Sequence, residues 1–415
     1  MSGRLRESEV DKMQETSTSS EAGLDSPSAQ NQYLRLETIG RISGTPHQVL
    51  IRYVFVGTKV IVFPARTGKQ GWFLNLQSNP KGRLFFQDKV FNCVAQTKTI
   101  TGLDDPLLSI FTRKYGKAVV NQYYKGQHSY AELIVQESAS ASFDEMIYGD
   151  LEAAFDAVAK DYDRHIFGNP INTWLRNVSV AVMSQLFKPG DTVLEIGCGT
   201  GTETLSLAKR GVRVVATDIS SKMVNVLNAK AKESGVSDNV IGVHSRPVHL
   251  KEELTKLGLS QLDGAYSTYG AINTEPRLQE TIRVLHDILK EGAPLVLGVW
   301  NKYCLYEVFG YTFKLKPRLA FARFRNPVPL GKSRFCVATN AFSVASLGRI
   351  VNPYFELKKV YGVVITLPPS NLTKYLPPRK LFGLWKSFDF NLGKTFPMNH
   401  LGDHFLAVYR RRAAG

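Results

Sequence analysis

The residues best placed to do chemistry surround a glycine-rich turn. Residues 193–201 have the sequence VLEIGCGTG, an apolar run that ends in the alternating glycines Gly197, Gly199 and Gly201. Glycine adopts positive φ and lets a ligand approach the backbone closely, so this run predicts a strand that stops in a tight binding turn. The acid Asp218 ends the next apolar run, RVVATDIS, where its carboxylate could accept hydrogen bonds from two ribose hydroxyls.

The spacing separates this site from a dinucleotide site. Dinucleotide folds use GxGxxG, in which the third glycine packs a helix near a pyrophosphate. Here that position is Thr202, and the pattern is instead E-x-G-x-G-x-G, with Glu195 ahead of the turn. A carboxylate there repels phosphates and suits a cationic ligand. The pattern therefore predicts a nucleotide-type cofactor that carries positive charge.

Length and composition indicate a folded chain of two domains. The chain has 415 residues, of which 43% are hydrophobic, and it has no apolar run of the length that a membrane-spanning helix needs. Residues 1–30 are polar and lack a signal sequence, which predicts a disordered tail. The four cysteines lack CxxC spacing, so we expect free thiols, no metal site and a cytoplasmic location, with peripheral membrane association left open.

Positive charge gathers at the C-terminal end. The net charge is +16, and from Lys302 onward 19 Lys and Arg residues stand against four acids. Such a polarised distribution favours an anionic partner near that end, although a solvated basic face with no partner remains an alternative.

The pattern of the chain changes near residues 137–145, a run of small polar residues. Before it, residues 31–140 contain short β-rich runs separated by GT, GK and NPKG turns, which predicts a small antiparallel barrel. After it, residues 150–415 alternate helix and strand, which predicts a parallel α/β sheet. Five strands precede an insert of about residues 302–350, and two terminal strands are expected to form a β-hairpin.

The second part resembles class I S-adenosylmethionine-dependent methyltransferases over roughly residues 150–412. The resemblance implies a seven-stranded Rossmann-like sheet, S-adenosylmethionine as cofactor, Glu195 as the motif's acid and Asp218 as the ribose-binding acid. It also implies that Tyr162 closes over the methionine end of the cofactor. Further cofactor contacts are implied in the segments after the second and third strands, at Ile219, Met223 and Ser245.

The loop STYGAIN, residues 267–273, is similar to the S-N-F-G-A-L-N loop of a group of uncharacterised microbial methyltransferases. It would face the transferred methyl group. The D/N-P-P-Y/F motif typical of enzymes that methylate adenine or amide nitrogen is absent, which disfavours methylation of base amines. The candidate catalytic residues, where a base is needed, are Tyr269, Asn273 and His404.

The first part resembles the split β-barrel of deazaflavin-dependent nitroreductase-type proteins, which are related to barrels that bind flavin mononucleotide. The matching pieces are G-R-x-S-G at 40–44 and W-x-x-N-L-x-x-N-P at 72–80. The resemblance implies a flavin or deazaflavin site that uses Arg41, Ser43, Trp72 and Asn75. A barrel that serves only for docking or homodimerisation is the alternative.

Residues 306–325, YEVFGYTFKLKPRLAFARFR, interleave aromatic and basic side chains. We expect a helix broken at Pro317 that forms a lid over a lipophilic or anionic acceptor and contacts an anionic membrane surface. Lys314, Lys316, Arg318, Arg323 and Arg325 are the cations expected there. A core helix with a solvated face and a single-stranded nucleic-acid site are the alternatives.

The sequence thus predicts an enzyme that transfers a methyl group from S-adenosylmethionine to a small lipophilic or anionic acceptor, with no nucleic-acid partner. Three alternatives remain: a flavin or deazaflavin reductase with a regulatory S-adenosylmethionine-binding domain, a non-catalytic adaptor, and an RNA methyltransferase. The completeness of the motifs favours the methyltransferase, because the glycines and both acids of the second part are intact while the barrel motif is partial.

Overall fold

The computed structural model describes residues 32–65, 70–86, 89–100, 106–124, 126, 129–136, 141–325, 328 and 337–413. The tail predicted for residues 1–30 lies outside these residues. The chain divides into two compact units, one of Met1–Asp150 with Pro329–Ala338 and the other of Leu151–Val328 with Thr339–Gly415. Among the described residues, no helix is both long and apolar enough to cross a membrane.

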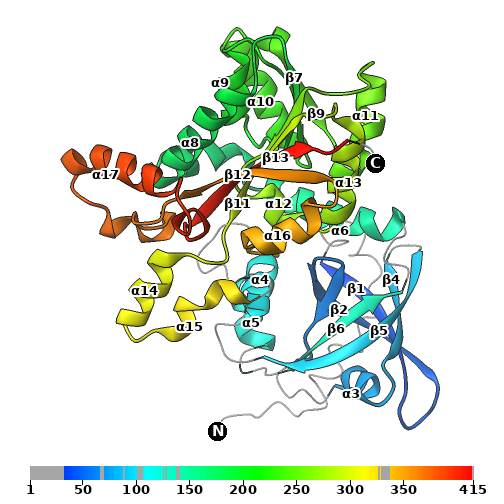
Figure 1. The fold of residues 1–415 in the computed structure, drawn as a ribbon. Coiled ribbons are helices and arrows are strands. Elements are labelled where there is room, and N and C mark those ends of the chain that lie inside the picture. The colour runs from blue at the N-terminus through cyan, green and yellow to red at the C-terminus, as the bar shows by residue number, and fades with distance from the viewer. Residues whose placement is uncertain are drawn as a thin grey trace. The chain divides into compact units, whose positions relative to one another are not determined.

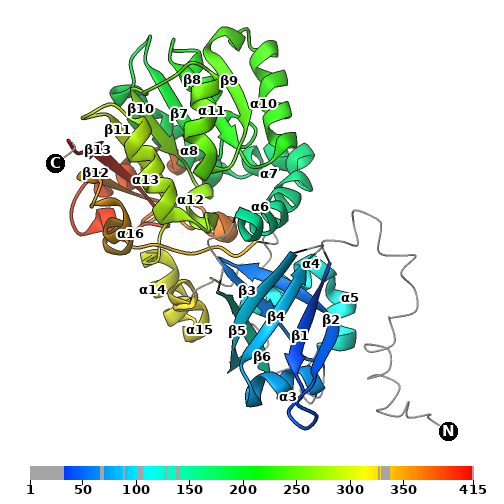
Figure 2. The same cartoon turned by 90° about the vertical axis from the view of Figure 1, so that its right-hand side faces the viewer.

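Unit 1 is a closed antiparallel barrel of six strands in the order β1-β2-β3-β6-β5-β4 (Figure 2), which confirms the predicted small antiparallel barrel. Aromatic residues from strand and helix fill its core, with the Phe63 ring 5.1 Å from Phe111 and 6.4 Å from Tyr124. Its elements are β1 (Tyr33–Ile39), β2 (Pro46–Val56), β3 (Lys59–Val62), α3 (Gly71–Ser78), β4 (Lys81–Phe86), β5 (Lys89–Thr99), α4 (Pro106–Tyr115), α5 (Lys117–Tyr123) and β6 (Ser129–Val135).

Unit 2 contains a seven-stranded sheet in the order β12-β13-β11-β10-β7-β8-β9. Strand β13 is antiparallel to both of its neighbours, and the pairs among β11, β10, β7, β8 and β9 are parallel. The predicted α/β class and seven-stranded sheet are therefore confirmed. The strands are β7 (Thr192–Ile196), β8 (Arg213–Asp218), β9 (Val240–His244), β10 (Gly264–Ser267), β11 (Pro294–Trp300), β12 (Phe355–Val363) and β13 (His404–Arg411).

Helices cover both faces of this sheet (Figure 1). One face packs against α11, α13 and α16, and the other against α8, α9 and α10. Because both faces are buried, the central strands are mostly apolar, and every residue of β10 is buried. The helices of unit 2 are α7 (Tyr162–Phe167), α8 (Pro170–Leu186), α9 (Thr202–Ala208), α10 (Ser221–Glu233), α11 (Leu250–Lys256), α12 (Ala271–Thr274), α13 (Leu278–Ile288), α14 (Leu305–Phe313), α15 (Pro317–Ala320), α16 (Val344–Val351) and α17 (Arg379–Leu392), and α6 (Ala141–Asp156) enters it from unit 1.

The insert expected at about 302–350 is shorter than predicted, because its last turns belong to the core. Helix α16 buries Val344, Leu347 and Val351 in the same apolar cluster as the sheet. The spacing of three and four residues puts these side chains on one helix face. Ser343 and Ser346 form a reciprocal cap that starts the helix.

A buried carboxylate anchors α17 to the end of β12. Asp389 is fully buried, and its oxygens accept hydrogen bonds from the backbone N–H groups of Val364, Ile365, Thr366 and Leu367 at 2.6–3.2 Å. These N–H groups have no partner in the sheet. The Asp389 carboxylate therefore takes the place of the backbone carbonyls that would otherwise accept their hydrogen bonds. Nothing in the sequence marks Asp389 as different from a surface acid.

We therefore expect Asp389→Ala to lower the free energy of unfolding of unit 2 by about 3 kcal/mol or more, because it leaves several buried donors without an acceptor. Urea unfolding followed by tryptophan fluorescence measures this change, since Trp174 and Trp385 lie in unit 2. Asp389→Asn keeps one acceptor oxygen and should lose less. An alanine variant as stable as the wild type would contradict the anchoring role.

Candidate cofactor and acceptor sites

The glycine turn follows β7 and precedes α9, and its three glycines all have positive φ, of 72°, 52° and 82° for Gly197, Gly199 and Gly201. A Cβ on Gly197 would overlap Ala271, and one on Gly201 would overlap Leu227. These overlaps, together with the positive φ, disfavour any side chain at the two positions. A Cβ on Gly199 would lie 3.5 Å from the Tyr162 ring, so Gly199 is the glycine that faces the covering segment.

Asp218 ends β8 beside this turn and is buried. Its Oδ2 accepts a hydrogen bond from the Gly199 N–H and its Oδ1 accepts one from the Ser220 N–H, both at 2.8 Å. Burial raises the pKa of Asp218 to about 6, although the two N–H groups act in the opposite direction. Each oxygen can accept a second hydrogen bond, which is what two ribose hydroxyls require.

A second acidic group lies under the turn. Glu195 is buried and accepts hydrogen bonds from the hydroxyls of Thr204 and of Tyr266, the latter at 2.8 Å. Nearby, Glu203 forms a two-bond ion pair with Arg176 at 2.8 and 2.6 Å. Burial and the carboxylate of Glu203 raise the pKa of Glu195. Arg176 therefore neutralises Glu203, and the raised pKa of Glu195 favours its protonated, neutral form.

Residues 156–163 cover the turn and are held there by acids. Asp156 accepts a hydrogen bond from the Ser220 hydroxyl at 2.5 Å, and Asp163 accepts one from the Thr200 hydroxyl at 2.5 Å. Lys230 pairs with Asp163 at 2.8 Å. Sequence reasoning selected Tyr162 in this segment and missed both acids. The position of Asp156 and Asp163 on either side of Tyr162, in the segment expected to cover the cofactor, could have pointed to them.

The remaining predicted cofactor residues line the ends of β8 and β9. The Ser245 N–H donates to the Asp218 carbonyl at 3.0 Å, and the Ser245 hydroxyl donates to the Arg246 carbonyl at 3.1 Å. Ile219 is half-buried and Met223 is fully buried. His244, which the sequence did not single out, contacts the Ile219 carbonyl and Glu152.

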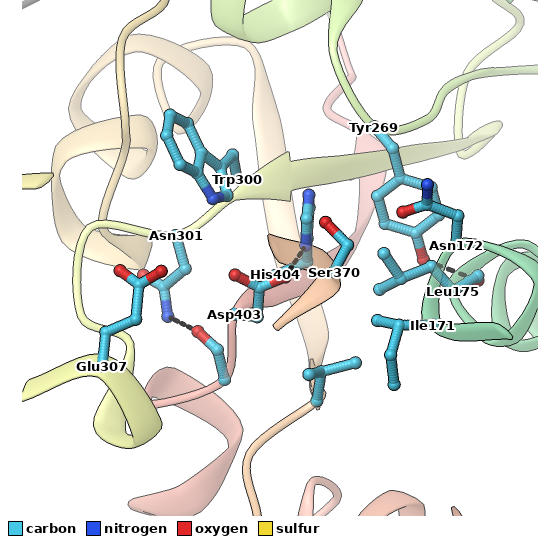
Figure 3. Close-up of polar contacts among 12 residues, drawn as sticks. Ile171, Asn172, Leu175, Tyr269, Trp300, Asn301, Glu307, Ser370, Asp403 and His404 are labelled. Carbon is cyan, nitrogen blue, oxygen red and sulfur yellow. Dashed lines mark hydrogen bonds and ion pairs between the residues drawn. The ribbon is translucent and has the colours of Figure 1, made fainter. Parts of the chain in front are cut away.

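Across the sheet edge, Tyr269 and His404 lie together (Figure 3). Their rings pack edge to face, with centroids 5.1 Å apart. The Tyr269 hydroxyl donates to the Leu175 carbonyl at 3.0 Å and accepts from Ser179 at 2.6 Å. Burial raises the pKa of Tyr269, so its phenol stays protonated. Tyr269 therefore packs against the His404 ring while its hydroxyl is hydrogen-bonded to α8.

His404 is oriented by a buried ionic network. Its Nδ1 lies 2.9 Å from Asp403, and Arg323 binds both Asp403 and Glu307, the latter at 2.7 Å. Burial alone would raise the pKa of Asp403, but Arg323 and His404 hold it well below its usual range. A carboxylate at Nδ1 favours the tautomer that leaves Nε2 as a proton acceptor.

Arg323 was predicted to be one of the surface cations of the insert, and that prediction is wrong. Its side chain is 4% exposed and also donates to the carbonyls of Asn301 and Asp403. The ion pairs with Glu307 and Asp403 draw it into the interior. The insert is therefore tied to β13 and to His404 through this residue.

Asn273 has a structural position. It is buried, its amide donates to the carbonyls of Trp300 and Asn340, and its oxygen accepts from the Trp300 N–H at 3.0 Å. Both amide hydrogens are used in joining the loop after β10 to the end of β11. The side chain thus sets the position of the loop that carries Tyr269.

In unit 1, the predicted barrel residues gather around the turn after β1. Asn75 of α3 accepts a hydrogen bond from the Arg41 N–H at 3.0 Å and donates to Thr38 at 3.1 Å. Ser43 lies 2.9 Å from His47, and Trp72 is buried on α3. The Arg41 side chain is exposed. This arrangement joins a cation, a hydroxyl and a fixed loop, which are suitable groups for binding a phosphate.

Comparisons with known proteins agree with this division. Residues 193–292 match the methyltransferase domain family, and residues 8–139 match the F420H(2)-dependent quinone reductase family. The chain joins a methyltransferase domain to a quinone-reductase-type domain. This confirms both resemblances that the sequence motifs carried.

Relatives match the methyltransferase domain in part. The tRNA 5-carboxymethoxyuridine methyltransferase of Escherichia coli K12 is 30% identical over 157 residues, 36% of this chain and 58% of that protein. The ubiquinone biosynthesis O-methyltransferase of Pseudomonas paraeruginosa is 30% identical over 149 residues, 34% of this chain and 61% of that protein. Across the first curated relatives, the match spans between 42% and 61% of their length.

Among solved structures, the CcbJ methyltransferase from Streptomyces caelestis is 16% identical, with a TM-score of 0.43. That match covers 64% of this chain and 99% of the other.

Within the described part of the chain, no group of three or more His, Cys, Asp and Glu side chains could hold a metal ion.

We expect Asp218→Ala to weaken S-adenosylmethionine binding tenfold or more, because charge-assisted hydrogen bonds contribute about 1.5–3 kcal/mol each. Calorimetry measures the affinity. The wild-type affinity should also fall as the pH drops below about 6, because protonation removes the acceptor that the ribose hydroxyls need. Asp218→Asn should flatten the part of the pH profile that Asp218 contributes. Wild-type affinity in the alanine variant would remove Asp218 from the cofactor site.

Proposed function

We propose that this protein transfers a methyl group from S-adenosylmethionine to a hydroxyl oxygen of a small, lipophilic acceptor. The observation that carries the proposal is the positive-φ turn at Gly199, whose N–H donates to Asp218 at the end of the neighbouring strand. A ribose is the feature that Asp218 recognises at this turn. S-adenosylmethionine contains a ribose, and the residues present fit it.

When bound, the cofactor supplies a methyl group on a sulfonium, which is already a good leaving group. The chain must therefore bind the cofactor and the acceptor, orient them, and take up the proton that the acceptor hydroxyl loses. Asp218 holds the ribose, and the segment around Tyr162 covers the site. Positioning of this kind supplies a large part of the rate in reactions between two bound molecules.

His404 would accept the proton from the acceptor hydroxyl. It begins β13, which is antiparallel to β11, so it lies at the carboxyl end of the parallel strands, as the glycine turn does. Asp403 fixes its ring and stabilises the positive charge that it gains on protonation. Tyr269 packs against the ring and prevents it from rotating.

The acceptor class is inferred from the two domains together. One relative of the methyltransferase domain is a ubiquinone biosynthesis O-methyltransferase, and the barrel matches the F420H(2)-dependent quinone reductases. A quinone that gains two electrons and two protons becomes a hydroquinone, whose hydroxyl is a methyl acceptor. We therefore propose phenolic or hydroquinone acceptors. The RNA-modifying relative makes RNA the competing acceptor class.

We expect His404→Ala to lower the rate of methyl transfer about 100-fold, which is the lower end of the rate loss that follows removal of a general base. The affinity for S-adenosylmethionine should stay unchanged. The assay follows tritium from labelled cofactor into a panel of catechols and hydroquinones. His400→Ala is the matched control, because His400 is half-buried near the same strand and contacts Asn399. Added imidazole should restore part of the lost rate.

Label that enters RNA and none of the phenolic compounds would contradict the proposed acceptor. A rate unchanged in His404→Ala would remove His404 from proton transfer and leave the cofactor assignment standing. Absence of S-adenosylmethionine binding by the wild-type protein would overturn the proposed function as a whole.

We also propose that the barrel binds a deazaflavin. The match to a family defined by F420H(2) supports this, as does the arrangement of Arg41, Ser43 and Asn75 around one turn. Arg41 would pair with the cofactor phosphate, and Asn75 would keep the Arg41 backbone in position. A flavin is the alternative ligand of the same site.

Arg41→Ala should weaken deazaflavin binding about tenfold, because it removes one charge-assisted contact to phosphate. Titration of coenzyme F420 followed by its fluorescence measures the affinity. Arg35→Ala is a suitable control, since Arg35 is an exposed cation on the adjacent strand β1. Equal losses in the two variants, or no binding by the wild type, would favour a barrel that serves only for docking.

A further inference from the structure

Unit 2 carries an apolar surface that neither proposed activity uses. It consists of two segments, residues 309–324 in the insert and residues 374–396 around α17, and we call it the aromatic surface. Leu315 is 89% exposed, Phe313 83% and Phe396 80%. Large apolar side chains exposed together in this way mark an interaction site, because isolated ones are the rule on soluble proteins.

Helix α17 presents a regular apolar stripe to solvent. Leu381, Leu384, Trp385 and Phe388 are all exposed and are spaced by three, one and three residues. This spacing places them on one face of the helix. The other side also contains apolar residues, since Phe382 and Phe390 pack against the core beside the buried Asp389. The helix is therefore apolar on both sides. On the exposed side the Trp385 indole N–H donates to the Thr366 hydroxyl at 3.0 Å, while the Leu384 and Phe388 side chains remain exposed.

The insert contributes the second half of the surface. Phe309 and Phe313, one helical turn apart on α14, have ring centroids 6.5 Å apart, and both are exposed. Lys314 connects the two halves, because its Nζ lies 2.7 Å from the Tyr375 hydroxyl and 4.0 Å from the centre of that ring. Figure 1 shows α14, α15 and α17 along the same side of unit 2.

The charges on the aromatic surface have one sign. Its exposed cations include Lys314, Lys316, Arg318, Lys374, Lys380 and Lys394. Residues 308–325 contain no acid, and the only acid of residues 370–400 is the buried Asp389. Lys394 lies 4.3 Å from the Phe390 ring, so its stem follows apolar surface while its ammonium group can reach a polar layer.

We propose that the aromatic surface binds the face of an anionic lipid bilayer. Leucine and phenylalanine side chains would enter the acyl boundary while the lysines contact phosphate headgroups. A second copy of the chain fits less well, because two copies facing each other would bring like charges together. Single-stranded nucleic acid would use stacked aromatic rings, whereas the exposed Leu315, Leu319, Leu381 and Leu384 cannot stack on bases. Helix α17 has 14 residues, fewer than a spanning helix needs, so it would lie in the interface.

This binding does not depend on the methyltransferase activity, and it can be tested alone. The full chain is sedimented with vesicles of phosphatidylglycerol and phosphatidylcholine, and with vesicles of phosphatidylcholine only. We expect binding to the anionic vesicles at low salt, weaker binding as salt rises, and little binding to the neutral ones. The fluorescence of Trp385 should shift to the blue on binding, and Trp385→Phe should remove that shift.

The variant Leu381→Gln/Leu384→Gln/Phe388→Gln should lower the vesicle partition coefficient about tenfold or more, since it removes three apolar side chains from the interface. A matched control, Val90→Gln/Leu257→Gln, changes exposed apolar residues outside the aromatic surface and should bind as the wild type does. S-adenosylmethionine affinity, measured in parallel, reports whether the variants are folded and tests the cofactor site separately.

Three results would overturn the proposal. The first is a wild-type protein that does not sediment with anionic vesicles at low salt. The second is an equal affinity of the triple variant and the control variant. The third is self-association of the wild type that the triple variant abolishes in the absence of any vesicle binding, which would assign the surface to a second copy.

Discussion

The methyltransferase domain depends on a backbone that approaches its neighbours too closely for any side chain. At Gly197 and Gly201 a Cβ would overlap Ala271 and Leu227, and both glycines have positive φ. This contact brings the end of β7 against α12 and α10, which is why the Gly199 N–H reaches Asp218 on the neighbouring strand. A larger residue at either glycine would separate these elements and open the site. Every polar contact described at the turn therefore depends on this steric constraint.

Buried charge then determines how the two sides of the site are held. On one side Arg176 pairs with Glu203 beside Glu195, and on the other Arg323 pairs with Glu307 and Asp403. Buried ion pairs add little net stability over apolar contacts, but loss of one partner costs about 3–5 kcal/mol. Such networks therefore hold their members in fixed positions. Here they fix the cofactor side and the His404 side independently, so a change in one should leave the other in place.

The same insert serves two purposes in the structure. Through Arg323 it holds Asp403 and thereby His404, while Phe309 and Phe313 on the same insert are exposed. Contact of the insert with a bilayer would therefore act on residues connected to the acceptor site.

The sequence by itself determined what rests on local geometry. Alternating glycines after an apolar run favour a strand that ends in a turn, and an acid at the end of the next strand lies beside them when the two strands pair in parallel, as β7 and β8 do. The barrel, the seven-stranded sheet and the position of Asp218 at its edge followed from such patterns. Tertiary structure decided the rest. Arg323 and Asp403 are 80 residues apart, and no local pattern distinguishes a buried arginine from the exposed ones around it.

For the same reason the sequence could not show which face of α17 is free. Its apolar residues occupy both faces, and only the packing of Phe382 and Phe390 against the core shows that Leu384 and Phe388 are left outside. Asp389, Asp156 and Asp163 were equally hidden, since each becomes distinctive through hydrogen bonds to residues at least 22 positions away. Contacts between distant segments form only when the chain has folded, and they decide which side chains are buried, paired or exposed.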